Sequence, residues 1–100
     1  MTRDEANRIL AESRANIDDI DLALVQLLNR RTRAVEAIGA AKEASGLPVY
    51  EPKREDDVYR NVLSHNSGPL PPEALRRIFE RIMDEMRSLQ KMRREGKGVS

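Results

Sequence analysis

The stretch LAESRANIDDIDLALVQLLNRRTRAVEAIGAA, residues 10–41, decides the fold, because it is a long run of residues with one glycine and no proline. Apolar residues recur in it at every seventh position, with one interruption, and a second row follows three positions later. We call the two rows together the apolar stripe: Leu10, Ile17, Leu24 and Ile38, with Ile20, Leu27, Ala34 and Ala41. This heptad pattern is typical of a helix that packs lengthwise against another helix.

The long helix has recognisable start and stop signals. Thr2 and Glu5 have the spacing of a capping box, and Gly46 followed by Pro48 is a stop signal, so we predict one helix over residues 3–45. Such a helix would be about 65 Å long, whereas a compact chain of this size has a radius of gyration of about 13 Å. One chain cannot cover its own apolar stripe. We therefore expect a homodimer or larger oligomer in which the stripe packs against a second copy, most simply as an antiparallel pair.

Two shorter helices are predicted after the long one. Pro52 suits the first turn of a helix over residues 52–64, and Pro72 opens a third helix over residues 72–93. Their apolar residues keep helical spacing: Val58, Val62 and Leu63 in the first, and Leu75, Phe79, Ile82, Met86 and Leu89 in the second. The expected fold is all-α, with three helices per chain, in a single domain over residues 1–100.

Composition excludes several classes of function. The chain has no cysteine and one histidine, which argues against a disulfide framework, a thiol nucleophile or a metal centre. A net charge of +1 and only three aromatic residues argue against nucleic-acid binding. No stretch approaches the roughly 20 apolar residues of a membrane span, and the polar start does not resemble a signal peptide. We expect a cytoplasmic protein that binds neither membrane nor nucleic acid.

Cations interrupt the apolar pattern of the long helix. Arg31 occupies the heptad position between Leu24 and Ile38, and Lys42 lies on the same side about 16 Å further along the axis. A small ligand fits between two such side chains. Arg14 lies about 25 Å before Arg31, too far to share that ligand with Lys42 of its own chain. In an antiparallel dimer, Arg14 of one chain would lie beside Arg31 of the other, and together they could bind a ligand with two carboxylates.

The two shorter helices carry polar residues on their apolar sides. Glu55 precedes Val58 by three residues, and Gln90 follows Met86 by four, so each should face a polar cavity. Arg54 and Glu51 flank Glu55, where Glu51 either caps the helix or borders the cavity. Each residue alone also has a structural explanation: a register-setting arginine, a solvated cation, a helix-terminal acid or an interhelical amide. The case for a binding site rests on their combination.

The sequence resembles the all-helical class of chorismate mutases, from about Leu10 to Gln90. Four strings carry the resemblance: SRANIDDID around Arg14, LLNRRTRAVEAIGAAK ending at Lys42, YEPKRED over residues 50–56, and FERIMDEMRSLQ ending at Gln90. The resemblance implies an intertwined homodimer of three-helix chains with two active sites. Each site would use an arginine from the first helix of the other subunit.

The resemblance also implies a role for each site residue, without any cofactor. Arg31 and Arg14 of the partner subunit would bind the two carboxylates of chorismate. Lys42 would reach a carboxylate and the ether oxygen, Gln90 would donate to that oxygen from the other side, and Glu55 would accept the ring hydroxyl. Three further residues would border the pocket: Glu51, Arg54 and Met86. Glu51 stands where family members usually have aspartate, and Met86 where some have a small polar residue.

The implied reaction matches the composition, since the rearrangement of chorismate to prephenate needs no nucleophile, metal or cofactor. Alternatives are an isochorismate pyruvate-lyase, a non-catalytic domain that senses chorismate or prephenate, and a plain coiled-coil interaction protein. The adjacent Arg54 and Glu55 favour the mutase. The segments GLP and NSGPLP around KREDD resemble mutase domains fused to, or bound by, the first synthase of the shikimate pathway. Association or fusion with that synthase is therefore a further expectation.

Overall fold

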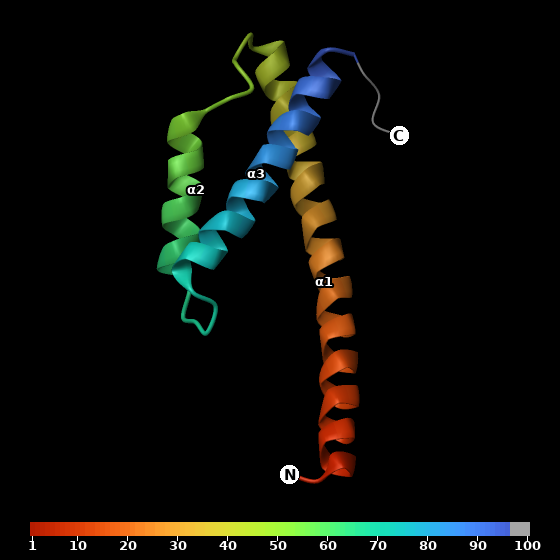
Figure 1. Ribbon diagram of the computed structural model, residues 1–100. Coiled ribbons are helices and arrows are strands. Elements are labelled where there is room, and N and C mark those ends of the chain that lie inside the picture. Colours follow the sequence, from red (N-terminus) through yellow and green to blue (C-terminus); the bar gives the residue numbers. More distant parts are fainter. Residues whose placement is uncertain (97–100) are drawn as a thin grey trace. The chain divides into compact units, whose positions relative to one another are not determined.

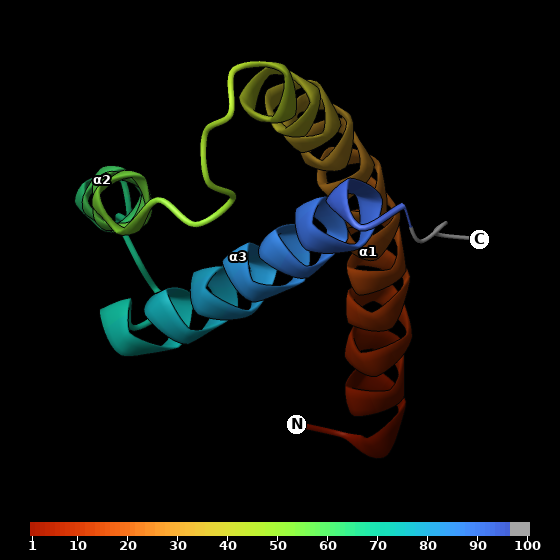
Figure 2. The same cartoon turned by 90° about the horizontal axis from the view of Figure 1, so that it is seen from above.

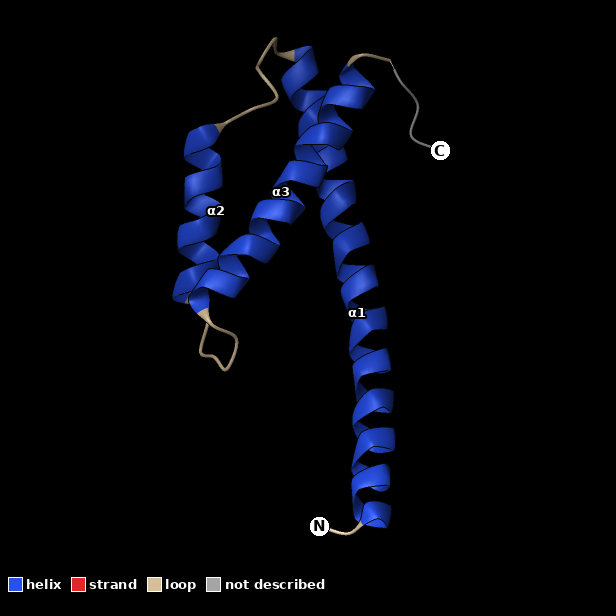
Figure 3. Cartoon of the chain, in the orientation of Figure 1, coloured by secondary structure: helices blue, strands red, loops and turns tan. Residues whose placement is uncertain are grey.

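The computed structural model describes residues 1–96, and within them the backbone forms three α-helices and no strand (Figures 1 and 3). The helices are α1 (Arg3–Ala44), α2 (Pro52–Ser64) and α3 (Pro72–Arg94). The prediction of an all-α chain with a long first helix is confirmed, and each predicted helix boundary lies within one residue of the observed one. The predicted domain runs to residue 100, and its last four residues lie outside the described part of the chain.

Local hydrogen bonds explain both ends of α1. The hydroxyl of Thr2 accepts a hydrogen bond from the backbone N–H of Glu5 at 3.1 Å, as the capping pattern predicts. At the other end Gly46 has a φ of 70°, and the N–H of Leu47 donates to the carbonyl of Lys42 at 2.8 Å. This Schellman motif requires a left-handed residue, which glycine supplies without steric cost. The motif ends α1 at Ala44, two residues after Lys42, and turns the chain towards α2, as Figure 2 shows from above.

The chain divides into two compact units, residues 1–34 and residues 35–100. The first unit consists mainly of the N-terminal part of α1, and its apolar side chains are about half exposed. The large exposed members of the apolar stripe in this unit are Leu10, Ile17, Ile20, Leu24 and Leu27. A run of large apolar side chains in water indicates a surface that another chain covers. The homodimer itself stays a prediction.

The second unit contains the end of α1 together with α2 and α3. Helices α2 and α3 contact each other and run in opposite directions at an angle (Figure 1), and the guanidinium of Arg76 lies 4.1 Å from the centre of the Tyr59 ring. The largest apolar burial is at Val35, 8% exposed, and Met83, 4% exposed. An ion pair of 2.7 Å joins Arg93 of α3 to Glu36 of α1. The unit thus has a small apolar core, and many of the contacts between its helices are polar.

Candidate functional site

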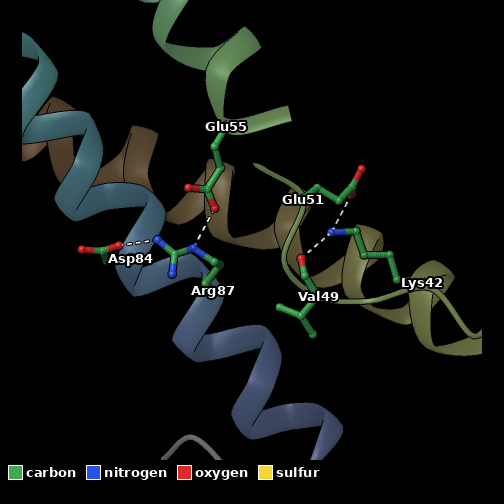
Figure 4. A network of polar contacts seen from close by, with 6 residues as sticks. All are labelled: Lys42, Val49, Glu51, Glu55, Asp84 and Arg87. Carbon is green, nitrogen blue, oxygen red and sulfur yellow. Dashed lines mark hydrogen bonds and ion pairs between the residues drawn. The ribbon is translucent and has the colours of Figure 1, made fainter. Parts of the chain in front are cut away.

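Lys42 is a buried cation near the end of α1, with 9% of its surface exposed. Its Nζ donates to the carbonyl of Val49 at 2.8 Å and forms an ion pair with Glu51 at 2.7 Å (Figure 4). An ammonium group has three hydrogens, so these two contacts, which are the ones that Lys42 makes within residues 1–96, leave one for a ligand. Burial of a charge is tolerated only where partners of this kind compensate the lost hydration. The two contacts therefore hold the Lys42 side chain in place before any ligand arrives.

Glu51 owes its position to the start of α2. It is the N-cap residue, ahead of Pro52 at the first helical position, but its side chain makes no capping hydrogen bond. The carboxylate instead turns to Lys42. Of the two expectations for Glu51, the helix cap is therefore wrong, because a buried ammonium is a stronger partner for a carboxylate than an exposed helix N–H.

Glu55 forms a second polar cluster with two residues of α3. Arg87 donates through Nε to Glu55 Oε2 at 2.7 Å and through Nη2 to Asp84 Oδ1 (Figure 4). The same guanidinium lies 5.2 Å from the centre of the Tyr50 ring. The side chain of Glu55 is only 19% exposed. The cluster gives the inward-facing carboxylate a fixed counter-ion.

The electrostatics of this cluster keep Arg87 protonated. Burial lowers the pKa of Arg87, but hydrogen bonds to Glu55 and Asp84 and their negative charges outweigh it, and the pKa is raised above its ordinary value. Arg87 is therefore a permanent cation beside Glu55.

Gln90 lies on α3 where the ends of α1 and α3 meet. It helps to line a cavity of about 260 Å³, and its side chain lies 3.5 Å from the position a Cβ would take on Gly39. The amide oxygen of Gln90 is buried and has no hydrogen-bond partner among the described residues. A buried polar atom without a partner is costly, and such atoms concentrate at functional sites.

The other predicted site residues differ in their exposure to solvent. Arg54 is exposed and makes no hydrogen bond or ion pair within residues 1–96, and Met86 is half-buried on α3. In the N-terminal unit, Arg14 is exposed and Arg31 is half-buried. The structure thus brings Lys42 together with Glu51.

Sequence reasoning missed Arg87, Asp84 and the carbonyl of Val49. A signal for Arg87 was present, since it follows the buried Met83 by four residues and precedes Gln90 by three. A charged residue one turn from a buried residue needs a partner. The Val49 carbonyl had no signal, because any residue type could have supplied it.

Two features of the described residues bear on the class of site. No group of three or more His, Asp or Glu residues in residues 1–96 has a geometry that could hold a metal ion. None of the helices in that part of the chain is long and apolar enough to cross a bilayer.

Comparison with known proteins places this geometry in a family. A family model for chorismate mutase type II matches residues 13–91. The chain is 36% identical over 85 residues to a bifunctional chorismate mutase/prephenate dehydratase of Neisseria gonorrhoeae, covering 85% of this chain and 23% of that relative. It thus spans about a quarter of the length of such bifunctional relatives. A chorismate mutase of Methanocaldococcus jannaschii is 28% identical over 83 residues, which are 82% of this chain and 84% of the relative.

A solved structure agrees with these sequence matches. The chorismate mutase of Thermus thermophilus, in its form II, superposes with a TM-score of 0.80 at 34% identity. The match covers 84% of this chain and 94% of that one. The chain has three helices, of which the first is long, and its residues 13–91 match the family model. The chain therefore belongs to the chorismate mutase type II family.

Proposed function

We propose that the chain is a chorismate mutase, which rearranges chorismate to prephenate. The observation that carries the proposal is Lys42: a buried ammonium, fixed by Val49 and Glu51, with one hydrogen left for a ligand. In the rearrangement the ether C–O bond breaks as a new C–C bond forms within one molecule, and negative charge grows on the ether oxygen. A preorganised cation stabilises that charge without reorganising.

Gln90 and Glu55 complete the set of polar contacts in this proposal. Gln90 donates from its amide to the ether oxygen, on the side opposite Lys42. Glu55 accepts the ring hydroxyl and orients the ring. The remaining task of the protein is to fold the substrate into its compact reactive conformer, which lowers the entropic part of the barrier. Pocket boundaries come from Glu51, Arg54 and Met86.

In this proposal each site needs a further cation besides Arg31 and Lys42, and a second copy of the chain supplies it. In the proposed antiparallel homodimer the apolar stripes pack together, and each site combines Arg31 and Lys42 of one subunit with Arg14 of the partner subunit. The two arginines bind the two substrate carboxylates bidentately. The half-exposed apolar side chains of residues 1–34 support this assembly, since pairing would remove them from water.

The test is a direct assay of the purified chain. Loss of chorismate absorbance with prephenate identified as the product is the expected result, alongside no release of pyruvate from isochorismate. Pyruvate release in the absence of prephenate formation would assign the pocket to a lyase. Binding of chorismate without turnover would instead make the chain a sensing domain. Sedimentation should give twice the 11.4 kDa chain mass.

The bifunctional relatives suggest a setting for this activity. Their names pair a chorismate mutase with a prephenate dehydratase in one polypeptide. We extend the proposal to an association of this chain, by fusion or by binding, with another enzyme of aromatic amino-acid biosynthesis. The first synthase of the shikimate pathway stays the predicted partner, and co-purification with the mutase is the measurement that tests it.

A further inference from the structure

Arg87 is fixed from three directions in the second unit. Its Nε donates to Glu55 Oε2 at 2.7 Å, its Nη2 donates to Asp84, and the ring of Tyr50 lies 5.2 Å from its guanidinium carbon. Figure 4 shows the guanidinium between the two carboxylates, which come from α2 and α3. A planar group held in this way has little rotational freedom left. It can therefore fix the direction of whatever it binds.

The contact occupies only one of the two oxygens of Glu55. Arg87 binds Oε2, and within residues 1–96 no hydrogen bond or ion pair is made to Oε1. An ionised carboxylate only accepts hydrogen bonds, so Oε1 is an acceptor for a donor outside the chain. The 19% exposure of the Glu55 side chain means that this acceptor lies in a partly desolvated position, where a hydrogen bond is stronger than in water.

We propose that Arg87 is a positioning residue, which holds the Glu55 carboxylate so that its second oxygen accepts the ring hydroxyl of the substrate. Through Glu55, Arg87 sets the preference for a substrate that carries that hydroxyl. This inference rests on the proposed function, because it concerns the same pocket. Arg87 itself touches neither the carboxylates nor the ether oxygen of the substrate.

The charge arrangement supports the assignment. Each of the two inward-facing charges has its own counter-ion, Lys42 with Glu51 and Glu55 with Arg87. Without Arg87 the Glu55 carboxylate would be part-buried with no counter-ion, and it would turn towards solvent to recover hydration. The acceptor would then no longer face the substrate.

The experiment compares two inhibitors in the wild type and in Arg87→Met. Both inhibitors are bicyclic ether dicarboxylates that mimic the rearranging substrate, and they differ only in whether the ring hydroxyl is present or replaced by hydrogen. The wild type should bind the hydroxylated compound at least about tenfold more tightly, as expected for a hydrogen bond to a charged group. In Arg87→Met the preference should fall to about twofold or less. A general loosening of the fold would weaken the binding of both compounds equally and leave the ratio of their affinities unchanged.

Further variants make the test independent of one substitution. Arg87→Lys keeps the charge without the planar donor, and Asp84→Asn weakens one of the contacts that hold Arg87, so both should give intermediate ratios. Arg81→Met is the matched control, since Arg81 lies on the same helix and, within residues 1–96, pairs only with the exposed Glu85 at 2.8 Å. Its ratio should equal that of the wild type. If Arg87→Met does not fold, Arg87→Lys and Asp84→Asn decide the question.

The possible failures are distinguishable. A wild type that converts chorismate but keeps its full preference in Arg87→Met and Arg87→Lys would overturn the role of Arg87 and leave the proposed function intact. A wild type that converts chorismate without preferring the hydroxylated compound would likewise overturn it. A wild type that does not convert chorismate would overturn the proposed function itself.

Discussion

Lys42 is a side chain whose stem and charge have separate roles. The stem lies against the protein near the end of α1, while Nζ is bound by a carbonyl and a carboxylate. Lys42→Ala keeps a good helix former at this position but removes the cation. We expect turnover to fall by at least about a hundredfold, the effect typical of one preorganised donor to a developing oxyanion. Steady-state kinetics measures the loss of turnover, and circular dichroism checks that the helices are retained. A loss of less than fivefold would show that Lys42 has no role in the reaction.

Gln90 offers a test through pH. Its amide does not titrate, so the wild type should show a flat rate profile from about pH 5 to 8. In Gln90→Glu the side chain donates to the ether oxygen only when protonated. Activity of this variant should therefore rise as the pH falls, as kcat measured across that range would show. A flat profile for the variant would contradict the contact.

At the residue scale, part of the candidate site can be predicted from sequence. Glu55 and Gln90 lie on the apolar sides of their helices, and Lys42 lies on the same side of the long helix as Arg31, so each of these polar residues needs a reason. The position of Arg87 one turn after Met83 indicates that it needs a partner, but the partner cannot be identified from sequence, because Glu55 lies 32 positions away on another helix. Only the rotation of α2 against α3 brings them together, and rotation depends on packing rather than on local pattern.

The helices themselves are predictable to within one residue at each boundary because their signals are local. Pro52 and Pro72 open α2 and α3, and Gly46 follows the end of α1. Each signal acts through the backbone of its own residue, so no tertiary information is required. The pairing of α2 with α3 has no such local signal.

Gly39 lies inside α1, where glycine weakens a helix. A Cβ at this position would meet Gln90 Cγ at 3.5 Å, an ordinary van der Waals distance. Gly39→Ala should therefore raise the free energy of unfolding by about 0.5–1 kcal/mol. Chemical denaturation is the measurement. Destabilisation would mean that the α3 side chain has no room to adjust.

The ionisation of Tyr59 makes the stability of the α2–α3 pair depend on pH in the alkaline range. Burial, assisted by the charge of Glu80, raises the pKa of its hydroxyl above 10.0, although the Arg76 cation opposes the shift. Below the unfolded-state pKa this contribution to stability is fully present. As the pH rises through the folded-state pKa, unfolding releases a proton and stability falls. Denaturation curves should show a smaller alkaline loss for Tyr59→Phe than for the wild type, with Tyr50→Phe as the control for a lost hydroxyl.

The whole assembly is tested by mixing two inactive variants. If Arg14 serves the partner's pocket while Lys42 serves its own, Arg14→Ala and Lys42→Ala dimers each contain two damaged sites. In a mixed dimer one site collects both lesions and the other is intact. Random pairing makes about half of the dimers mixed, so co-refolding equal amounts should restore about one quarter of wild-type activity. Verified mixed dimers with only the average parental activity would refute the shared site.

The exposed apolar stripe of the N-terminal unit also has a consequence for dosage. If only paired chains carry complete pockets, then at low protein concentration the total reaction rate is proportional to the number of dimers and not to the number of chains. In that regime the number of pairs grows with the square of the amount of chain, so a twofold rise in synthesis would give a fourfold rise in flux. At abundant protein the response becomes proportional. The unpaired helix surface would thus make a cell's rate of gene expression a steep control on its supply of prephenate.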